Sequence, residues 1–297
     1  MAIEITFLGT SCMQPTKTRN HSGFMLQAGV ENILFDCGEG IQRQMRLAGL
    51  KPAKITRILI SHWHGDHVFG LSGLLSSMGA DKEDKTVKIY GPPGSKKYFE
   101  HLLKSFAAKD IIDFEVIEVK NGTIFENNDF RLEAQKLEHS TTCFGYSFIE
   151  QDRLRIIVNK AEKLGLQGPI LGKLQQGEDV IFKGQKIKAD EITTLVKGRK
   201  ISYVADTTLC KGANILAKDA DLLISEGTHL EDIREKTEKY MHLTVKDAAI
   251  MASENNAKKL IITHISQRYK EPSEILAEAK TYFSNSSVAE DFMKVRL

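Results

Sequence analysis

The residues most suited to chemistry form one short run, Ser61-His62-Trp63-His64-Gly65-Asp66-His67. Its three imidazoles and one carboxylate are suitable ligands for Zn²⁺, and also for Mn²⁺, iron or Co²⁺. His62 and His64 are two residues apart, so an extended segment points both side chains the same way. Asp66 and His67 follow the turn at Gly65 and can serve a second cation close by. The run therefore predicts a metal centre rather than a group of solvated loop histidines.

Further candidate ligands stand where other apolar runs end. A strand that ends in an acid or an imidazole places that group at the rim of a sheet, where the sites of α/β proteins usually lie. Four residues have this position: His139, Asp206, Glu226 and His264. Each alone is as compatible with a capping or surface role as with metal binding. Together with the first run they supply the roughly seven or eight bonds that two metals need.

The remaining histidines carry weaker signals. His21 lies in a polar loop, His101 is expected on the surface of a helix, and His229 fits either a structural or a functional role. His242 lies just before a helix expected from Val245, so a catalytic role and a role in the loop both remain open.

Two metals narrow the chemistry to a few reactions. They make a water molecule acidic enough to attack near neutral pH and stabilise the attacking and leaving oxygens of a displacement. Hydrolysis of a phosphodiester, lactone, thioester or amide is therefore expected, and the cluster alone does not choose among these. Some redox enzymes hold two irons with similar ligands.

Composition limits the class of protein. A chain of 297 residues with 41% hydrophobic and 27% charged residues is typical of an ordinary globular protein. No apolar run reaches the roughly 20 residues of a membrane span, and residues 1–10 lack the layout of a signal peptide. The four cysteines form no CxxC pair, which argues against a zinc ribbon or a disulfide framework. We expect a cytoplasmic enzyme with reduced thiols and no membrane partner.

Strands and helices must position the candidate ligands. Strands are expected, from hydrophobic patterning, at 3–8, 32–35, 58–60, 87–90, 113–119, 130–137, 144–149, 153–158, 200–204, 222–225 and 260–263. Helices are expected at 41–48, 70–78, 95–106 and 272–283, and a turn at 121–122. Strands alternate with helices at both ends of the chain, around a β-rich middle. This pattern indicates an α/β sandwich with mixed sheets. Residues 160–177, with three lysines and four glycines, fit either a plain loop or a functional segment.

The motif His62-x-His64-x-Asp66-His67, with the downstream ligands, resembles the metallo-β-lactamase superfamily over almost the full chain. The resemblance implies one domain over residues 1–297, with the αβ/βα four-layer sandwich of that fold and metals at the sheet edges. It also implies two Zn²⁺ per subunit, with Mn²⁺ or another divalent metal as the alternative. The implied ligands are His62, His64 and His139 for one metal, Asp66, His67 and His264 for the other, and Asp206 for both. Asp66 would also be the proton acceptor.

Within the superfamily, a loop near the start of the chain is similar to a motif of ribonuclease Z, the transfer RNA 3′-processing endonuclease. The segment Pro15-Thr-Lys17-Thr-Arg19-Asn20 resembles the PxKxRN loop of that family. It is a compact cationic loop that can meet phosphates near the site. The resemblance implies that Pro15, Lys17, Arg19 and Asn20 bind substrate and discriminate against a mature CCA end.

A second similarity lies in the segment that fits no simple element. Gly168-Pro169, followed by Lys173 in a Leu-Gly-Lys-Leu run, resembles the flexible arm with which ribonuclease Z clamps transfer RNA. The arm would span about residues 155–195. The net charge of +2, from 41 Lys+Arg against 39 Asp+Glu, argues against a nucleic-acid partner only if it is evenly spread. Residues 151–200 hold 11 Lys+Arg and 6 Asp+Glu, a local +5 that leaves −3 elsewhere, so RNA binding is expected to be local.

A third similarity concerns two short motifs in the last third of the chain. Glu226 with Thr228, and His242 with Thr244, match parts of the HEAT and HST motifs of ribonuclease Z, and the other letters differ. The resemblance implies that Glu226 orients His242 and that His242 stabilises or protonates the scissile phosphate.

Together these similarities imply a short-form ribonuclease Z. Such an enzyme is a zinc-dependent endoribonuclease that removes the 3′ trailer of precursor transfer RNA, leaving a 3′-hydroxyl and a 5′-phosphate on the trailer. A homodimer is implied, in which the arm of one subunit holds RNA for the site of the other. The alternative is another hydrolase of the superfamily, such as a small-molecule phosphodiesterase or a lactonase. A metal-bound RNA-binding protein without turnover is a further alternative.

Overall fold

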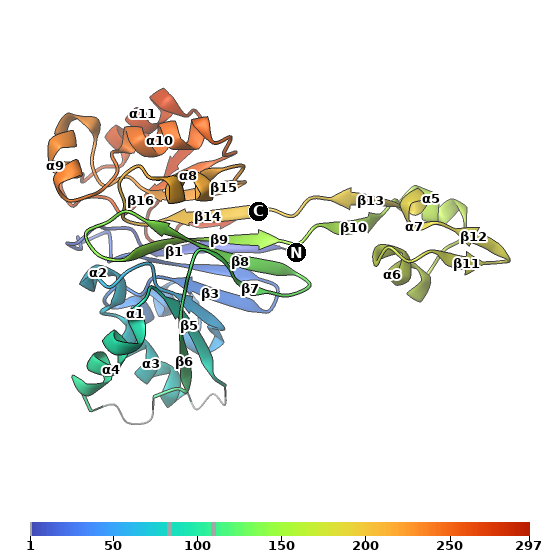
Figure 1. Cartoon of the computed structure of the whole chain (residues 1–297), viewed down its shortest axis with the longest axis horizontal. Coiled ribbons are helices and arrows are strands. Elements are labelled where there is room, and N and C mark those ends of the chain that lie inside the picture. The colour runs from blue at the N-terminus through green and yellow to red at the C-terminus, as the bar shows by residue number, and fades with distance from the viewer. Residues whose placement is uncertain (1, 82–84, 108–110) are drawn as a thin grey trace.

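Two seven-stranded sheets face each other, and helices cover the outer face of each (Figure 1). The computed structural model describes residues 2–81, 85–107 and 111–297. The four layers agree with the expected αβ/βα sandwich. None of the helices in these described ranges is long and apolar enough to cross a bilayer.

The first sheet is ordered β18-β1-β2-β3-β4-β5-β6. Its strands are Lys294–Arg296 (β18), Ile3–Gly9 (β1), Gly23–Ala28 (β2), Glu31–Phe35 (β3), Arg57–Leu59 (β4), Val87–Gly91 (β5) and Phe114–Glu118 (β6). Strands β3 to β6 are parallel, because each connection crosses over through helical segments. These helices are Ile41–Leu47 (α1), Gly65–Val68 (α2), Leu71–Ala80 (α3) and Ser95–Lys104 (α4).

The second sheet is ordered β17-β16-β15-β14-β9-β8-β7. Its strands are Ser286–Val288 (β17), Leu260–Thr263 (β16), Leu222–Glu226 (β15), Lys200–Val204 (β14), Cys143–Glu150 (β9), Phe130–Leu137 (β8) and Gly122–Glu126 (β7). Strands β14 to β17 are parallel, and the connecting helices are Lys211–Ala217 (α8), Arg234–Lys239 (α9), Val245–Glu254 (α10) and Ser273–Tyr282 (α11). Parallel strands place their carboxyl ends at one edge, which is where the candidate ligands follow them.

The main core lies between the sheets and is rich in aromatic rings. Phe24 stacks on Phe35 with ring centroids 4.5 Å apart, and Tyr203 of the opposite sheet meets Phe24 edge-on at 5.1 Å. A second core packs the other face of the first sheet against its helices, through residues such as Ile58 and Leu74. Both faces of that sheet are therefore buried, which explains its nearly continuous apolar strands.

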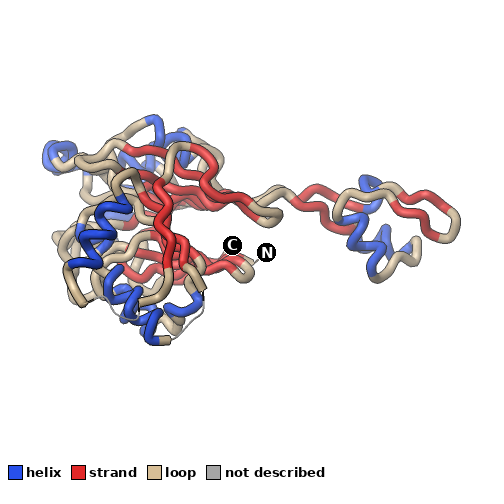
Figure 2. Tube along the Cα trace, turned by 60° about the horizontal axis from the view of Figure 1, so that its bottom comes forward, coloured by secondary structure: helices blue, strands red, loops and turns tan. Residues whose placement is uncertain are grey.

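An arm projects from the second sheet, well away from the body of the molecule (Figures 1 and 2). Its stalk is an antiparallel pair, Arg153–Ile156 (β10) with Thr193–Val196 (β13). Its outer part contains Val158–Lys163 (α5), Pro169–Gln175 (α6), Val180–Phe182 (β11), Gln185–Ile187 (β12) and Ala189–Ile192 (α7). These elements bury a small apolar cluster of their own, including Leu166, Leu174 and Val180. Residues 160–177 are therefore no plain loop, because they contribute to this cluster.

Some elements differ from the sequence predictions. Strands β2, β17 and β18 were not expected, and β7 begins at Gly122, where the sequence predicts only a turn. Strand β18 is three residues long and forms by pairing Arg296 with Glu4 of β1. A partner from the other end of the chain determines such a strand, so local patterning does not reveal it.

Candidate metal and catalytic site

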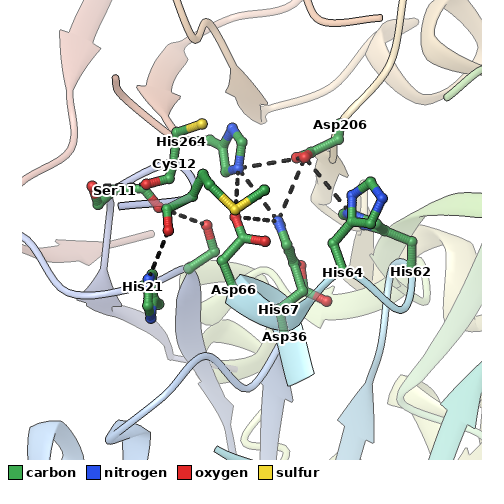
Figure 3. Close-up of polar contacts among 12 residues, drawn as sticks. Ser11, Cys12, His21, Asp36, His62, His64, Asp66, His67, Asp206 and His264 are labelled. Carbon is green, nitrogen blue, oxygen red and sulfur yellow. Dashed lines mark hydrogen bonds and ion pairs between the residues drawn. The ribbon is translucent and has the colours of Figure 1, made fainter. Parts of the chain in front are cut away.

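The seven predicted metal ligands converge at the carboxyl edges of the two sheets, and Figure 3 labels all of them except His139. The ligand atoms of His62, His64, His139 and Asp206 all lie within 4.8 Å of one another. Those of Asp66, His67 and His264 form a second group by the same measure. The structure thus brings residues from four different connections to one place.

Asp36, which the sequence analysis did not single out, orients one of these imidazoles. Its Oδ2 lies 2.8 Å from Nδ1 of His67, so the ring donates its Nδ1 proton to the carboxylate. Nε2 of His67 then carries the lone pair that a metal requires. Asp36 directly follows β3, and the rule that strand ends carry polar site residues could have found it.

Two more imidazoles are oriented in the same manner. Nδ1 of His139 lies 3.0 Å from the carbonyl oxygen of Met241 and must donate to it. Nδ1 of His264 lies 3.0 Å from Oγ1 of Thr228, whose hydroxyl donates to Glu226 Oε2 at 2.7 Å. In both rings Nε2 is therefore left as the acceptor that faces the cluster.

The arrangement fits divalent cations because acceptors face one another. Nε2 of His62 and Nδ1 of His64 are 3.0 Å apart, and Nε2 of His139 lies 3.2 Å from the same Nδ1. Lone pairs held this close repel unless a cation or proton lies between them. Asp206 adds a buried Oδ1 without a hydrogen-bond partner. Nitrogen and carboxylate donors at such spacing bind divalent metal ions.

Burial and neighbouring charges shift the pKa values of the cluster in both directions, and burial lowers those of His62 and His64. Burial alone would lower the pKa of His67, but the carboxylates of Asp206, Asp66 and Asp36 raise it well above its usual range. Burial would raise the pKa of Asp206, but the imidazoles of His264, His67 and others lower it well below its usual range. Ionised carboxylates that face imidazole nitrogens form a site in which metal cations can replace protons.

Glu226 and His242 form a buried pair beside the ligands. Nδ1 of His242 lies 3.1 Å from Oε1 of Glu226, whose side chain is completely buried. Oε1 also accepts from the backbone N–H of Thr207 at 2.8 Å, which fixes the carboxylate. Burial lowers the pKa of His242, and Glu226 more than offsets this, so the pKa lies above its usual range. Asp206, His242 and His264 also form a third group of possible ligands.

A cavity of about 500 Å³ opens onto this cluster. Ligands in its wall include His64, Asp66 and His139, and His242 lines the same space. The rest of its lining mixes polar and apolar residues, with Gln14, Gln267, Lys236, Met13 and Tyr240 among them. The cavity therefore gives a substrate direct access to the proposed ligands and to His242.

The loop at Pro15–Asn20 is held in place by hydrogen bonds from two of the residues predicted to bind RNA, Arg19 and Asn20. Pro15 and Lys17 are exposed, but Arg19 is only 7% exposed. Nη1 of Arg19 donates to Thr10 Oγ1 at 2.7 Å and to a backbone carbonyl at 2.6 Å. Nδ2 of Asn20 donates to the carbonyl of Glu39 at 2.8 Å. In this structure Arg19 and Asn20 thus hold the loop in place, and the substrate contact predicted for them stays a prediction.

The predicted arm residues lie apart from the metal cluster. Gly168 immediately precedes α6, Pro169 begins it, and Lys173 is exposed on the same helix. Their helix belongs to the outer part of the arm, away from the body of the same chain (Figure 2). His101 is exposed on α4.

Trp63, between two ligands, packs away from the metals. Its ring stacks on Tyr98 at 5.0 Å and its Nε1 donates to Ser95 Oγ at 2.8 Å.

Histidine and carboxylate ligands at the edges of two facing sheets define a metal-dependent hydrolase of the metallo-β-lactamase fold. YhfI from Bacillus subtilis, a metallo-β-lactamase fold protein, has this fold at a TM-score of 0.73 and 21% identity, over 100% of this chain and 99% of that one. The chain belongs to the ribonuclease Z family, and through residues 3–190 also to the family described as "Anti-Pycsar protein Apyc1".

Close similarity to ribonucleases Z extends over the full chain. The ribonuclease Z of Methanothermobacter thermautotrophicus is 41% identical over 297 residues, which cover 99% of this chain and 97% of that protein. That of Bacillus cereus strain B4264 is 40% identical, with 97% of each covered. Human tRNase Z, short form, superposes with a TM-score of 0.72 at 28% identity, over 98% of both chains. The predicted fold, family and enzyme class, a hydrolytic endoribonuclease, are confirmed.

Proposed function

We propose that this endoribonuclease removes the 3′ trailer from precursor transfer RNA, leaving a 3′-hydroxyl on the transfer RNA and a 5′-phosphate on the trailer. The observation that carries the proposal is the Glu226–His242 pair beside the metal-ligand cluster, in a chain similar throughout to ribonucleases Z. The name tRNase Z of the human neighbour supports transfer RNA as the substrate.

We propose that the site holds two Zn²⁺ ions, with Mn²⁺ or another divalent metal as the alternative. We propose the following ligands: His62, His64 and His139 for one ion, Asp66, His67 and His264 for the other, and Asp206 for both. When bound, such cations supply Lewis acidity, which makes water a nucleophile near neutral pH and neutralises charge on the phosphate.

The residues of the chain then move the protons. Asp66 accepts a proton from the attacking water while the water oxygen forms its bond to phosphorus. The P–O3′ bond breaks, and the departing O3′ takes a proton from Nε2 of His242. Glu226 holds Nδ1 of His242, so that Nε2 faces the cavity with its proton. The raised pKa of His242 supports this acid role, because it favours the protonated ring that a general acid needs.

The arm and the Pro15–Asn20 loop are proposed to hold the RNA. The arm lies within residues 151–200, the segment with a net charge of +5, and Lys173 is exposed there. It reaches away from the body of its own chain (Figure 1), which supports a homodimer in which it serves the site of a second subunit. Exposed Lys17 would meet phosphates near the 3′ end. We propose a cytoplasmic location, where precursor transfer RNA would be met.

The decisive experiment is cleavage of a precursor transfer RNA, with and without chelator, followed by mapping of both new ends. We expect one metal-dependent cut that leaves the stated ends, and unchanged cleavage in metal-free buffer would contradict the two-metal mechanism. Deleting residues 161–176 should weaken precursor binding and leave hydrolysis of bis(p-nitrophenyl) phosphate intact. Unchanged precursor affinity after this deletion would contradict the role of the arm and favour a small-molecule hydrolase.

A further inference from the structure

Tyr240 is an exposed aromatic residue in the wall of the cavity that opens onto the metal-ligand cluster. It is 53% exposed, and it lines the same space as His64, His139 and His242. Proton transfer and metal binding, as described above, make no use of its ring. An exposed aromatic ring in the cavity of a phosphodiester-cleaving site can stack on a planar group of the ligand.

The backbone fixes the ring relative to the catalytic groups. Tyr240, Met241 and His242 follow α9 in one tight turn, with Met241 in the left-handed region at φ 57°. The carbonyl of Met241 accepts from His139, and the backbone N–H of His242 donates to the carbonyl of Thr237 at 3.1 Å. One turn thus places the ring, a ligand-orienting carbonyl and the catalytic imidazole at consecutive positions.

One cationic side chain shares the cavity with the ring, and another lies over the ring. Lys236, one turn earlier on α9, lines the same cavity, and Nζ of Lys239 lies 5.9 Å from the ring centroid of Tyr240. A nucleotide combines a flat base with an anionic phosphate, so a ring and an ammonium group side by side match both parts. The cavity, at about 500 Å³, is within the usual range for small-molecule sites and is large enough for a nucleotide.

We propose that Tyr240 stacks on the nucleobase next to the scissile phosphate, with Lys236 facing the phosphate group of the same nucleotide. The proposal rests on the proposed function, because it describes how that site holds its RNA. Every base has a π face, so this subsite positions the RNA without selecting a sequence.

The first test compares kcat/KM for precursor cleavage among Tyr240 variants. Tyr240→Ala should lower it roughly 5- to 150-fold, which corresponds to about 1–3 kcal/mol. Tyr240→Phe should match the wild type because it keeps the ring, whereas Tyr240→Leu should behave like the alanine variant. The matched control is Tyr282→Ala, since Tyr282 is 38% exposed with Lys246 Nζ 5.5 Å from its ring centroid, but does not line the cavity.

Substrates with a missing base separate stacking from a structural effect. The precursor is made abasic at the nucleotide on one side of the cut, and in a second version on the other side. With one of these, the loss caused by Tyr240→Ala should disappear, because no base is left to stack. If Tyr240→Ala lowers kcat/KM fully on both abasic precursors, or does not lower it on the intact precursor, the stacking proposal is wrong. The proposed function is unaffected by either result. If the wild-type protein cleaves no precursor, the proposed function is contradicted, and the stacking proposal that depends on it is contradicted too.

Discussion

Nδ1 of His67, a proposed metal ligand, lies 2.8 Å from Oδ2 of Asp36, and both side chains are fully buried. The same oxygen accepts from the hydroxyl of Tyr203 at 2.8 Å, and Oδ1 accepts from the backbone N–H of Ser61 at 2.7 Å. One carboxylate therefore fixes the tautomer of a proposed ligand and the start of the loop that carries three others.

Replacing Asp36 by Asn should weaken metal binding. An amide has one acceptor oxygen, so one of the present donors would face an NH₂ group instead. We expect zinc affinity to fall about 10- to 100-fold, as is usual when a partner that orients a ligand is lost. Competition with a chromophoric chelator measures this. Tyr203→Phe is the control, because it leaves the His67 contact in place, and an unchanged affinity in Asp36→Asn would show that the carboxylate does not orient His67.

His242→Ala should impair the chemical step and not metal binding. Removing a general acid typically lowers the rate about 10²- to 10⁴-fold. We expect this loss in the rate constant of cleavage measured under single-turnover conditions. Metal content, measured by elemental analysis, should stay at the wild-type value. A lower metal content would instead assign His242 to the group that it forms with Asp206 and His264.

The sequence located most of the site through one simple rule. Apolar strands that end in acids or imidazoles pointed to Asp206, Glu226 and His264, and the structure places all three at the same cluster. Asp36 obeys the same rule after β3, but its role as a partner of His67 becomes visible only when the two sheets face each other.

The roles of other parts of the site cannot be predicted from residue types. The carbonyl of Met241 orients His139, and any residue has a carbonyl, so its identity gives no signal. Arg19 shows the opposite problem. A cation in a polar loop indicates solvent exposure, yet its guanidinium is buried because Thr10 and a carbonyl accept its hydrogen bonds. Tertiary partners decide both cases.

The arm should control the salt dependence of RNA binding. The positive excess lies within residues 151–200, which include the arm, and the rest of the chain is net negative, so affinity should fall more gently with salt than for a uniformly basic protein. Lys173→Ala should reduce the slope of log Kd against log salt by about 1, as expected for one lost phosphate contact. Lys97→Ala, on exposed α4, should leave the slope unchanged. A steep slope that neither variant alters would contradict local binding.

Asp291 joins the Pro15–Asn20 loop to the body of the protein. Its Oδ1 accepts from the hydroxyl of Thr10 at 2.8 Å, and its Oδ2 accepts from the backbone N–H of Asn20 at 2.7 Å and from Gln44 Nε2 at 3.0 Å. Burial raises the pKa of this carboxyl to about 6, although the hydrogen bonds from Asn20 and Thr10 oppose the rise.

This raised pKa predicts a specific pH dependence of stability. The folded state holds a proton on Asp291 up to about pH 6, whereas the unfolded chain releases it near pH 4. The contribution is therefore fully present below about pH 4 and is lost as pH rises through 6. Asp291→Asn stays neutral and fits if the Thr10 hydroxyl turns to accept. The free energy of unfolding, wild type minus variant, should increase by up to about 3 kcal/mol as pH falls from 7 to 4. Urea unfolding at several pH values measures this difference, and a constant difference would show that folding does not raise the pKa of Asp291.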